Sequence, residues 1–350
     1  MGAYTTARPS DAQTPSIGRA VLLLLRSCSI RFATYYWVGF VAGLSANGRL
    51  DLKWALLGVP MWLSYGIAAE AVNRLADREV DVINRPERTA LCEEFGWARL
   101  TRVCVGAWVL FFLIAAALVW EHPSVSLTVL LLLNTGIAIG YSIGPAFKRH
   151  RVLSLLSLTA PMATPLLTGW AIHGNNDTLL SPVVPIAVVL AVFSLGLSGI
   201  KDITDVEGDR ELNYNSLWLG MVRLRRGAAV YMLIGAPFLL VALFAALGKL
   251  PVISLALFPL VVLSALVVSA ASRAEVPADR ETAREVMHNY TFYFLALGLL
   301  VAVPEPAMVV AFAVSIGIWL LASKFLHWSG GLSFAQLVRW GALSVKTAGK

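Results

Sequence analysis

Long uninterrupted apolar segments recur along almost the whole chain, and they constrain its fold more than any other feature. A helix needs roughly 20 apolar residues to cross the hydrocarbon core of a bilayer. Ten runs approach or reach that length, at about 29–47, 54–72, 103–120, 124–143, 152–173, 181–200, 228–248, 251–271, 287–303 and 307–325. Because unpaired backbone groups are costly in lipid, such runs form helices. The sequence therefore predicts an all-α, polytopic transmembrane bundle of nine to ten helices, since only Pro304-Glu305-Pro306 separates the last two runs.

The distribution of Lys and Arg predicts how this bundle is oriented. Sixteen of these residues fall in every second connection, at 73–100, 145–151, 201–226 and 273–286. The other connections hold only Arg49, Lys53 and Lys249. Positive residues mark the cytoplasmic side, so we expect an integral protein of the cytoplasmic (plasma) membrane, if the source is bacterial, with these four connections in the cytoplasm. This bias and the lipid bilayer as partner explain the net charge of +7, so no nucleic-acid partner is expected.

The two ends of the chain differ in character from the apolar middle. We expect residues 1–18 to be a disordered tail, residues 19–326 to form the transmembrane domain, and residues 327–350 to form a C-terminal tail on the membrane surface. The apolar stretch Ala20–Leu25 is too short for a signal segment and predicts an interfacial turn. No paired or metal-ligand spacing links the three cysteines, which are expected to be free thiols: Cys28, Cys92 and Cys104.

Two acidic clusters follow the second and sixth apolar runs. They consist of Asn73, Asp77 and Asp81, and of Asp202, Asp205 and Asp209. On a helix, the spacings i, i+4, i+8 and i, i+3, i+7 place each set along one stripe. Carboxylates this close repel one another near a bilayer unless cations bind between them. Mg2+ suits such oxygen ligands because it completes its coordination with water and phosphate oxygens. All six residues are therefore predicted metal ligands.

The position of the clusters favours a ligand site over a solvated helix end or a transporter. Asp77 and Asp205 are 128 residues apart with four helices between them, so both clusters return to the same membrane face. This repeat suggests a duplicated four-helix unit with the site between its halves. Basic residues accompany both clusters, which favours a substrate with phosphates. Ion-coupling carboxylates of transporters usually lie near the bilayer midplane, whereas these lie at helix ends.

Three segments together resemble the UbiA superfamily of membrane prenyltransferases, over about residues 25–300. The first, Asn73 to Asp81, resembles the family's N-D-x-x-D-x-x-x-D motif, and Asn84-Arg85-Pro86-Glu87-Arg88 resembles its continuation. The second, Lys201 to Arg210, resembles the K-D-x-x-D-x-x-G-D form of branches that act on homogentisate and chlorophyll precursors. The third, Tyr141 to Pro145, resembles a Y-S-x-P-P element after the fourth helix.

The chain departs from the family pattern at three places. Arg74 stands where the first Asp of the motif is frequent, which leaves one carboxylate fewer. Phe147-Lys148-Arg149 replaces an Arg-x-Lys sequence, and Asn213 to Leu217 replaces a Gly-x-x-Thr-Leu-Pro run. These differences leave open the number of metal ions and which basic residue reaches phosphate.

The resemblance implies an enzyme that ionises a prenyl diphosphate with Mg2+ and transfers the prenyl group to an acceptor, here expected to be aromatic. The expected catalytic residues are Asp77, Asp81, Asp202, Asp209 and Tyr141. The expected diphosphate ligands are Asn73, Arg88, Ser142, Lys148, Arg149 and Lys201. A terpene cyclase on the same scaffold, which needs no acceptor, is the alternative.

Aromatic side chains on the expected helices are candidates for stabilising the prenyl cation. They are Tyr35, Tyr36, Trp37, Trp62, Tyr65, Phe193, Tyr290 and Tyr293. Lipid contact or an interfacial belt is the alternative role for each. His288 and Asn289 are candidates for binding the acceptor or accepting its proton, with a helix-end role as the alternative.

Overall fold

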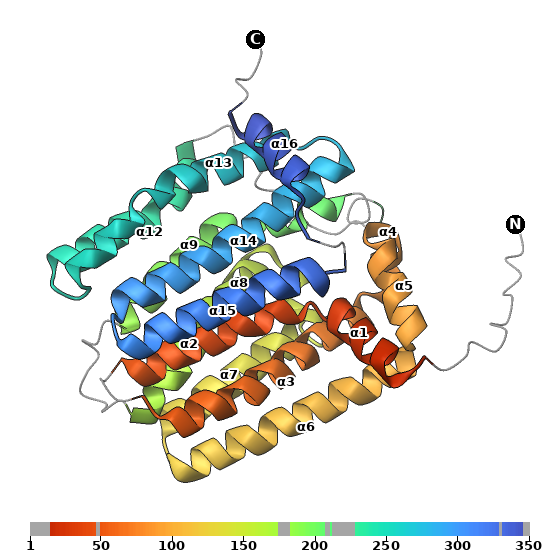
Figure 1. The fold of residues 1–350 in the computed structure, drawn as a ribbon, viewed down its shortest axis with the longest axis horizontal. Coiled ribbons are helices and arrows are strands. Elements are labelled where there is room, and N and C mark those ends of the chain that lie inside the picture. The colour runs from red at the N-terminus through yellow and green to blue at the C-terminus, as the bar shows by residue number, and fades with distance from the viewer. Residues whose placement is uncertain are drawn as a thin grey trace, which may run out of the picture.

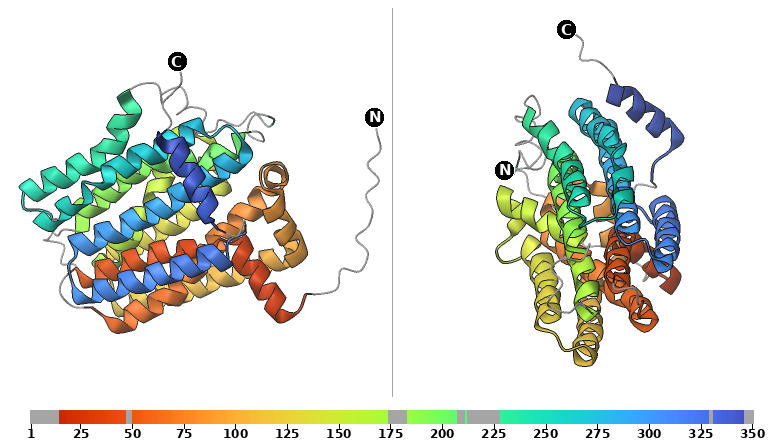
Figure 2. Two further views of the ribbon diagram at one scale, coloured as in Figure 1. Left: turned by 45° about the horizontal axis from the view of Figure 1, so that its top comes forward. Right: turned by 90° about the vertical axis from the view of Figure 1, so that its left-hand side faces the viewer.

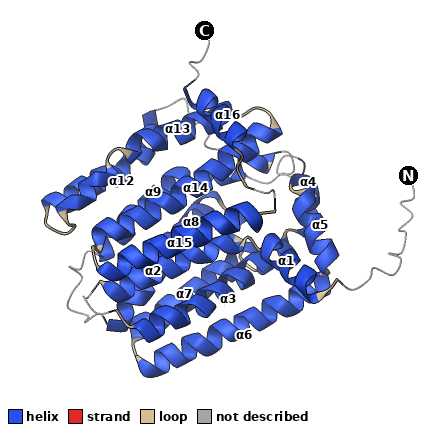
Figure 3. Ribbon diagram, in the orientation of Figure 1, coloured by secondary structure: helices blue, strands red, loops and turns tan. Residues whose placement is uncertain are grey.

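The computed structural model describes residues 15–46, 50–173, 183–206, 211, 228–328 and 331–345 (Figure 1). Within these ranges every regular element is helical (Figure 3), which confirms the all-α prediction. The α-helices are α1 (Ile17–Ser27), α2 (Ala33–Ser45), α3 (Leu52–Ala76), α4 (Arg78–Asn84), α5 (Pro86–Phe95), α6 (Trp97–Glu121), α7 (Val125–Ser142), α8 (Arg151–His173), α9 (Val183–Leu197), α12 (Ala228–Ala246), α13 (Leu260–Arg273), α14 (Pro277–Ala302), α15 (Pro306–Phe325) and α16 (Phe334–Val345). Four short 3-10 helices join them: η1 (Ile30–Phe32), η2 (Phe147–Arg149), η3 (Ser198–Thr204) and η4 (Val252–Leu257).

Each of the ten predicted apolar runs coincides with a helix of the bundle. Seven helical segments are long and apolar enough to cross a membrane, within the described part of the chain. The first, sixth and eighth runs are each divided between a 3-10 helix and an α-helix. The ninth, α14, begins at Pro277, earlier than predicted, because Val276 is extended and Pro277 occupies the first helical position. The long helices run side by side, as Figure 2 shows from two directions.

Short helices that the apolar runs do not include lie outside the spanning bundle. The turn predicted at Ala20–Leu25 is wrong, because these residues belong to α1, whose start is capped by Ser16 accepting a hydrogen bond from the Arg19 backbone at 3.4 Å. Helices α1, α4 and α5 gather at one end of the bundle (Figure 1). In the C-terminal tail, α16 is helical and contacts α13, while Phe334 and Val338 stay exposed. Its place at the membrane surface remains a prediction.

The core depends on an unusually close approach of α2 and α8. A Cβ atom added to Gly43 would lie 2.1 Å from the Leu166 carbonyl oxygen, and one added to Gly169 would lie 2.1 Å from that of Phe40. Small residues let membrane helices pack backbone to backbone. This contact fixes the C-terminal half of α8 against α2. Residues nearer the N-terminus of α8 form one side of the cavity described next. The three cysteines are free, as predicted, and all three are buried.

Candidate active site

A cavity of about 360 Å³ lies at the end of the bundle where α3, α4 and α5 meet η3 and α14. Both acidic motifs reach it, although more than 120 residues separate them. Eight basic and five acidic side chains line its wall, which gives an excess of three positive charges. The charged residues are Arg31, Arg74, Arg85, Arg88, Lys148, Arg149, Lys201, Arg284, Glu70, Asp77, Asp81, Asp202 and Asp205. The structure thus places the described residues of both motifs around one cavity together with basic side chains, while their role in binding stays a prediction.

The first motif does not form the continuous helical stripe that its spacing predicts. Helix α3 ends at Ala76, Asp77 has φ −101° and ψ 11°, and α4 starts at Arg78, so Asp81 lies on a separate helix. The Asn73 side-chain amide donates to Asp77 Oδ2 at 2.7 Å and to Ser142 Oγ at 3.0 Å. Lys148 donates to the other oxygen of Asp77. Ser142 thus supports Asn73 from outside the cavity wall.

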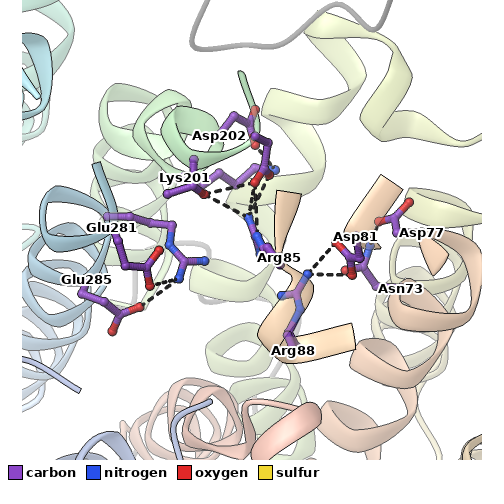
Figure 4. Close-up of polar contacts among 12 residues, drawn as sticks. Asn73, Asp77, Asp81, Arg85, Arg88, Lys201, Asp202, Glu281 and Glu285 are labelled. Carbon is purple, nitrogen blue, oxygen red and sulfur yellow. Dashed lines mark hydrogen bonds and ion pairs between the residues drawn. The ribbon is translucent and has the colours of Figure 1, made fainter. Parts of the chain in front are cut away.

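Asp81 is held by two buried arginines rather than by its neighbours in the motif. Arg88 Nη2 lies 2.8 and 2.7 Å from the two oxygens of Asp81 (Figure 4). Arg74 Nη1 lies 3.1 Å from Asp81 Oδ2. Arg74 also donates to Glu70 at 2.6 Å. Burial raises the pKa of the Asp81 carboxyl, but Arg88 and Arg74 lower it below its ordinary value overall. Among the five predicted metal ligands that the structure describes, Asp81 is therefore the one most fully engaged by basic side chains.

The second motif starts in the 3-10 helix η3, which ends at Thr204. Three residues make one turn of such a helix, so Asp202 and Asp205 fall on the same side, and both line the cavity. Lys201 Nζ contacts Asp202 Oδ1 at 2.9 Å and donates to the Tyr141 hydroxyl at 2.5 Å. Asp209 lies outside the described residues.

Arg85, which the sequence analysis did not assign to the site, connects the two motifs. It lies between α4 and α5, and its Nη2 is 2.7 and 2.8 Å from the two oxygens of Asp205 (Figure 4). Burial raises the pKa of Asp205, but the Arg85 guanidinium more than offsets this and lowers the pKa to about 2. The signal in the sequence was a basic residue before Pro86. Nothing local could indicate a partner 120 residues away.

The aromatic candidates separate into two groups. Tyr35 and Tyr36 line the cavity, and so do Phe32, Tyr141 and Trp328, which were not among these candidates. The remaining candidates pack elsewhere in the helix bundle and are not part of this wall: Trp37, Trp62, Tyr65, Phe193, Tyr290 and Tyr293. The prediction fails for them because aromatic content alone does not tell which face of a helix meets the cavity.

The carboxylate and amide oxygens of the cavity suit a hard divalent cation as ligands. Within the described ranges, no group of three or more Asp, Glu, His or Cys residues forms a metal site by itself. Mg2+, however, uses only one or two carboxylates and takes its other ligands from water and phosphate. The neighbouring pairs Asn73 with Asp77 and Asp202 with Asp205 supply such oxygens on two sides of the same cavity. The residues therefore fit Mg2+ that is shared with a phosphate-bearing substrate.

Sequence comparison identifies the family of this helix bundle. The sequence model of the UbiA prenyltransferase family matches residues 32–293. The chain belongs to this family. The match includes both acidic motifs and the segment from Tyr141 to Pro145, so the resemblance on which the sequence analysis relied is confirmed.

Two curated relatives share part of their sequence with this UbiA-family protein. Homogentisate phytyltransferase of Synechocystis sp. is 27% identical over an alignment of 170 residues that covers 45% of this chain and 53% of the relative. The 33 kDa chain of bacteriochlorophyll synthase of Rhodobacter capsulatus is 31% identical over an alignment of 185 residues that covers 45% of this chain and 57% of the relative. The matches thus span little more than half the length of these relatives.

Solved structures share the fold over most of the chain. A structure described for digeranylgeranylglyceryl phosphate synthase in membranes has a TM-score of 0.57 at 15% identity, with 82% of this chain and 99% of that chain covered. A UbiA homolog from Archaeoglobus fulgidus bound to GPP and Mg2+ has a TM-score of 0.52 at 18% identity, with 86% and 98% covered. Together with the apolar helices, these findings make the chain an integral membrane protein of the UbiA fold.

Proposed function

We propose that this UbiA-family protein is a Mg2+-dependent prenyltransferase that moves a prenyl group from a prenyl diphosphate to an aromatic acceptor and releases diphosphate. The observation that carries the proposal is the cavity in which two acidic motifs meet an excess of three positive charges. A prenyl diphosphate joins an anionic head to an apolar tail, and only the head needs such a wall. The GPP and Mg2+ bound by the A. fulgidus homolog support the same assignment.

The basic residues of the cavity wall would bind the diphosphate and stabilise its departure. Lys148, Lys201, Arg85 and Arg88 present charge-assisted donors from three sides of the cavity. As the allylic C–O bond breaks, its electron pair moves to the diphosphate oxygen, and fixed positive groups lower the energy of the charge that develops there. Mg2+ held by Asn73, Asp77, Asp202 and Asp205 would add positive charge at the same leaving group.

The pairs between acidic and basic side chains give these donors fixed positions. Asp81 orients Arg88, and Asp205 orients Arg85, each through two hydrogen bonds from one guanidinium nitrogen. Tyr141 accepts a hydrogen bond from Lys201 and keeps its ammonium beside the second motif. Such prior orientation reduces the reorganisation needed in the transition state.

The apolar part of the cavity wall is where the prenyl tail would lie. Leu158, Pro161 and Met162 of α8 and Leu197 of α9 line the cavity beside the charged residues. These side chains exclude water from the reacting allylic carbon, which protects a carbocation from capture by water. With the orientation predicted from Lys and Arg, the diphosphate would enter from the cytoplasm.

The test compares Asp77→Asn with Asp51→Asn in purified protein. Both changes remove one carboxylate charge at an end of α3, but Asp51 caps the far end and Asn is an equally good cap. We expect Asp77→Asn to slow Mg2+-dependent diphosphate release by about 100-fold or more, and Asp51→Asn to leave it within about twofold. Release that is equally fast in the two variants would refute the assignment.

A further inference from the structure

One part of the cavity wall carries neither acidic motif nor predicted phosphate ligand. We call it the α2–α14 wall, and it consists of Phe32, Tyr35, Tyr36, Met287, His288 and Thr291. Met287, His288 and Thr291 follow the i, i+1, i+4 spacing of one face of α14. Aromatic rings face them from η1 and α2, so this wall can enclose a flat ring.

Two polar groups on the α2–α14 wall have no hydrogen bond within the part of the chain that the structure describes. They are the imidazole of His288 and the hydroxyl of Tyr36, and both residues are only partly buried. By contrast, the Tyr35 hydroxyl donates to the His288 carbonyl at 3.0 Å, and the Thr291 hydroxyl donates to the Met287 carbonyl at 2.8 Å. Polar groups at a cavity surface that lack a protein partner are available to a ligand.

The imidazole of His288 is held in place although its nitrogens are available. Its ring meets the ring of Phe32 edge-on at a centroid distance of 5.2 Å. The hydrogen bond from Tyr35 to the His288 carbonyl ties α2 to α14 at the same level. A side chain fixed in this way can act on a ligand without first being ordered.

The charges around His288 are balanced, unlike those on the phosphate side of the cavity. Arg31 Nη2 donates to Glu285 Oε1 at 2.9 Å, and His327 Nε2 lies 3.2 Å from the same oxygen. Arg284 donates to Glu281 at 2.5 Å. Each of the two arginines is thus paired with a carboxylate behind the wall, so they are less available to a second phosphate than the basic residues beside the acidic motifs. A neutral hydroxyl suits this surrounding better.

We propose that the α2–α14 wall is the acceptor subsite and that it takes a hydroxyarene whose O–H donates to His288. This inference rests on the proposed function and specifies its acceptor. The allylic C–O bond breaks with its electron pair on diphosphate, and a ring carbon of the acceptor bonds to the allylic carbon. The acceptor hydroxyl gives its proton to the His288 imidazole as the ring becomes a ketone. Transfer of the ring proton to oxygen then restores the phenol, so diphosphate and one proton are released in total. Tyr36 orients the same hydroxyl group.

The first experiment measures binding and does not require turnover. Homogentisate, a dihydroxylated ring, is titrated by calorimetry into the full chain, as the wild type and as His288→Gln, Tyr36→Phe and His173→Gln. His173 is the matched control, at the end of α8 away from the cavity. We expect about tenfold weaker binding for His288→Gln, a severalfold loss for Tyr36→Phe, and no change for His173→Gln. No binding by the wild type, or equal binding by His288→Gln, would overturn the proposal.

The second experiment separates a proton-accepting role from a structural one. For the wild type, we expect kcat/KM for the acceptor to fall at low pH as His288 becomes protonated. The His288→Gln variant should not show this fall, and its rate should be about 100-fold lower than that of the wild type. The KM for prenyl diphosphate should not change. A parallel rise of that KM, or an unchanged pH profile, would contradict the assignment. Homogentisate binding through His288 without any diphosphate release would instead refute the proposed function and leave the subsite standing.

Discussion

The pair formed by Arg85 and Asp205 makes a quantitative prediction about stability. It joins the turn between α4 and α5 to the end of η3, and the two side chains are only 13% and 23% exposed. Replacing Arg85 with Gln removes both short hydrogen bonds and leaves the Asp205 carboxylate partly buried without its partner. Breaking such a pair from one side is costly because the remaining charge is still desolvated.

The size of the effect follows from the pKa of Asp205. Burial raises this pKa, and the Arg85 guanidinium, with smaller contributions from Arg284 and Lys201, lowers it. The net result is a pKa of about 2 instead of 3.8, a shift that corresponds to ~2 kcal/mol of stability. Because the folded-state pKa is depressed, this contribution is fully present above the ordinary pKa of about 4. It is lost as the pH falls from there toward 2. Arg85→Gln should therefore destabilise the protein at pH 7 and much less at pH 3.

The assay is thermal unfolding in detergent for Arg85→Gln, Asp205→Asn and the double variant, with exposed Arg102→Gln as the charge-matched control. We expect Arg85→Gln to lower the melting temperature by about 4–8 °C at pH 7, and the double variant to lose less than the sum of the single ones. The control Arg102→Gln should change the melting temperature little. Strictly additive effects, or an Arg85→Gln effect that persists undiminished at pH 3, would refute the reasoning.

Two further predictions concern packing and the metal. Gly43→Ala should lower the melting temperature strongly because its Cβ would lie 2.1 Å from the Leu166 carbonyl oxygen. The control Gly136→Ala, whose Cβ would have nothing within 4 Å, should be neutral or slightly stabilising. Equal melting temperatures for the two variants would contradict the close contact of α2 and α8. Treatment with EDTA should stop diphosphate release. Mg2+ should restore the release better than Ca2+, because the larger Ca2+ ion favours more protein ligands. Diphosphate release that survives EDTA would contradict the metal role.

The sequence predicted those parts of the fold that depend on local properties. Spanning length and apolarity are properties of each run alone, so all ten runs coincide with helices. The helix break at Asp77 was missed, because the spacing of Asn73, Asp77 and Asp81 is equally regular in a straight helix. Helix α1 was missed since a short amphipathic helix at a surface resembles a turn in composition.

The sequence indicated the motifs of the candidate site but not the ion pairs within it. The motifs drew attention to Asp77 and Asp202, and to the basic residues Arg88, Lys148, Arg149 and Lys201, all of which line the cavity. It could not show that Arg88 binds Asp81 or that Arg85 binds Asp205, since those contacts depend on how α4, α5 and η3 pack. Which acidic residue pairs with which basic residue depends on the tertiary structure, and a single sequence does not show it.

Product analysis by mass spectrometry tests the central claim most directly. The purified protein is incubated with Mg2+ and prenyl diphosphates of different lengths, with and without a panel of phenols and aromatic acids. The proposed function predicts diphosphate release together with a product heavier than one acceptor by one prenyl group. A cyclic terpene formed without acceptor would contradict the transferase and support the cyclase alternative, and no release of diphosphate under any condition would contradict both.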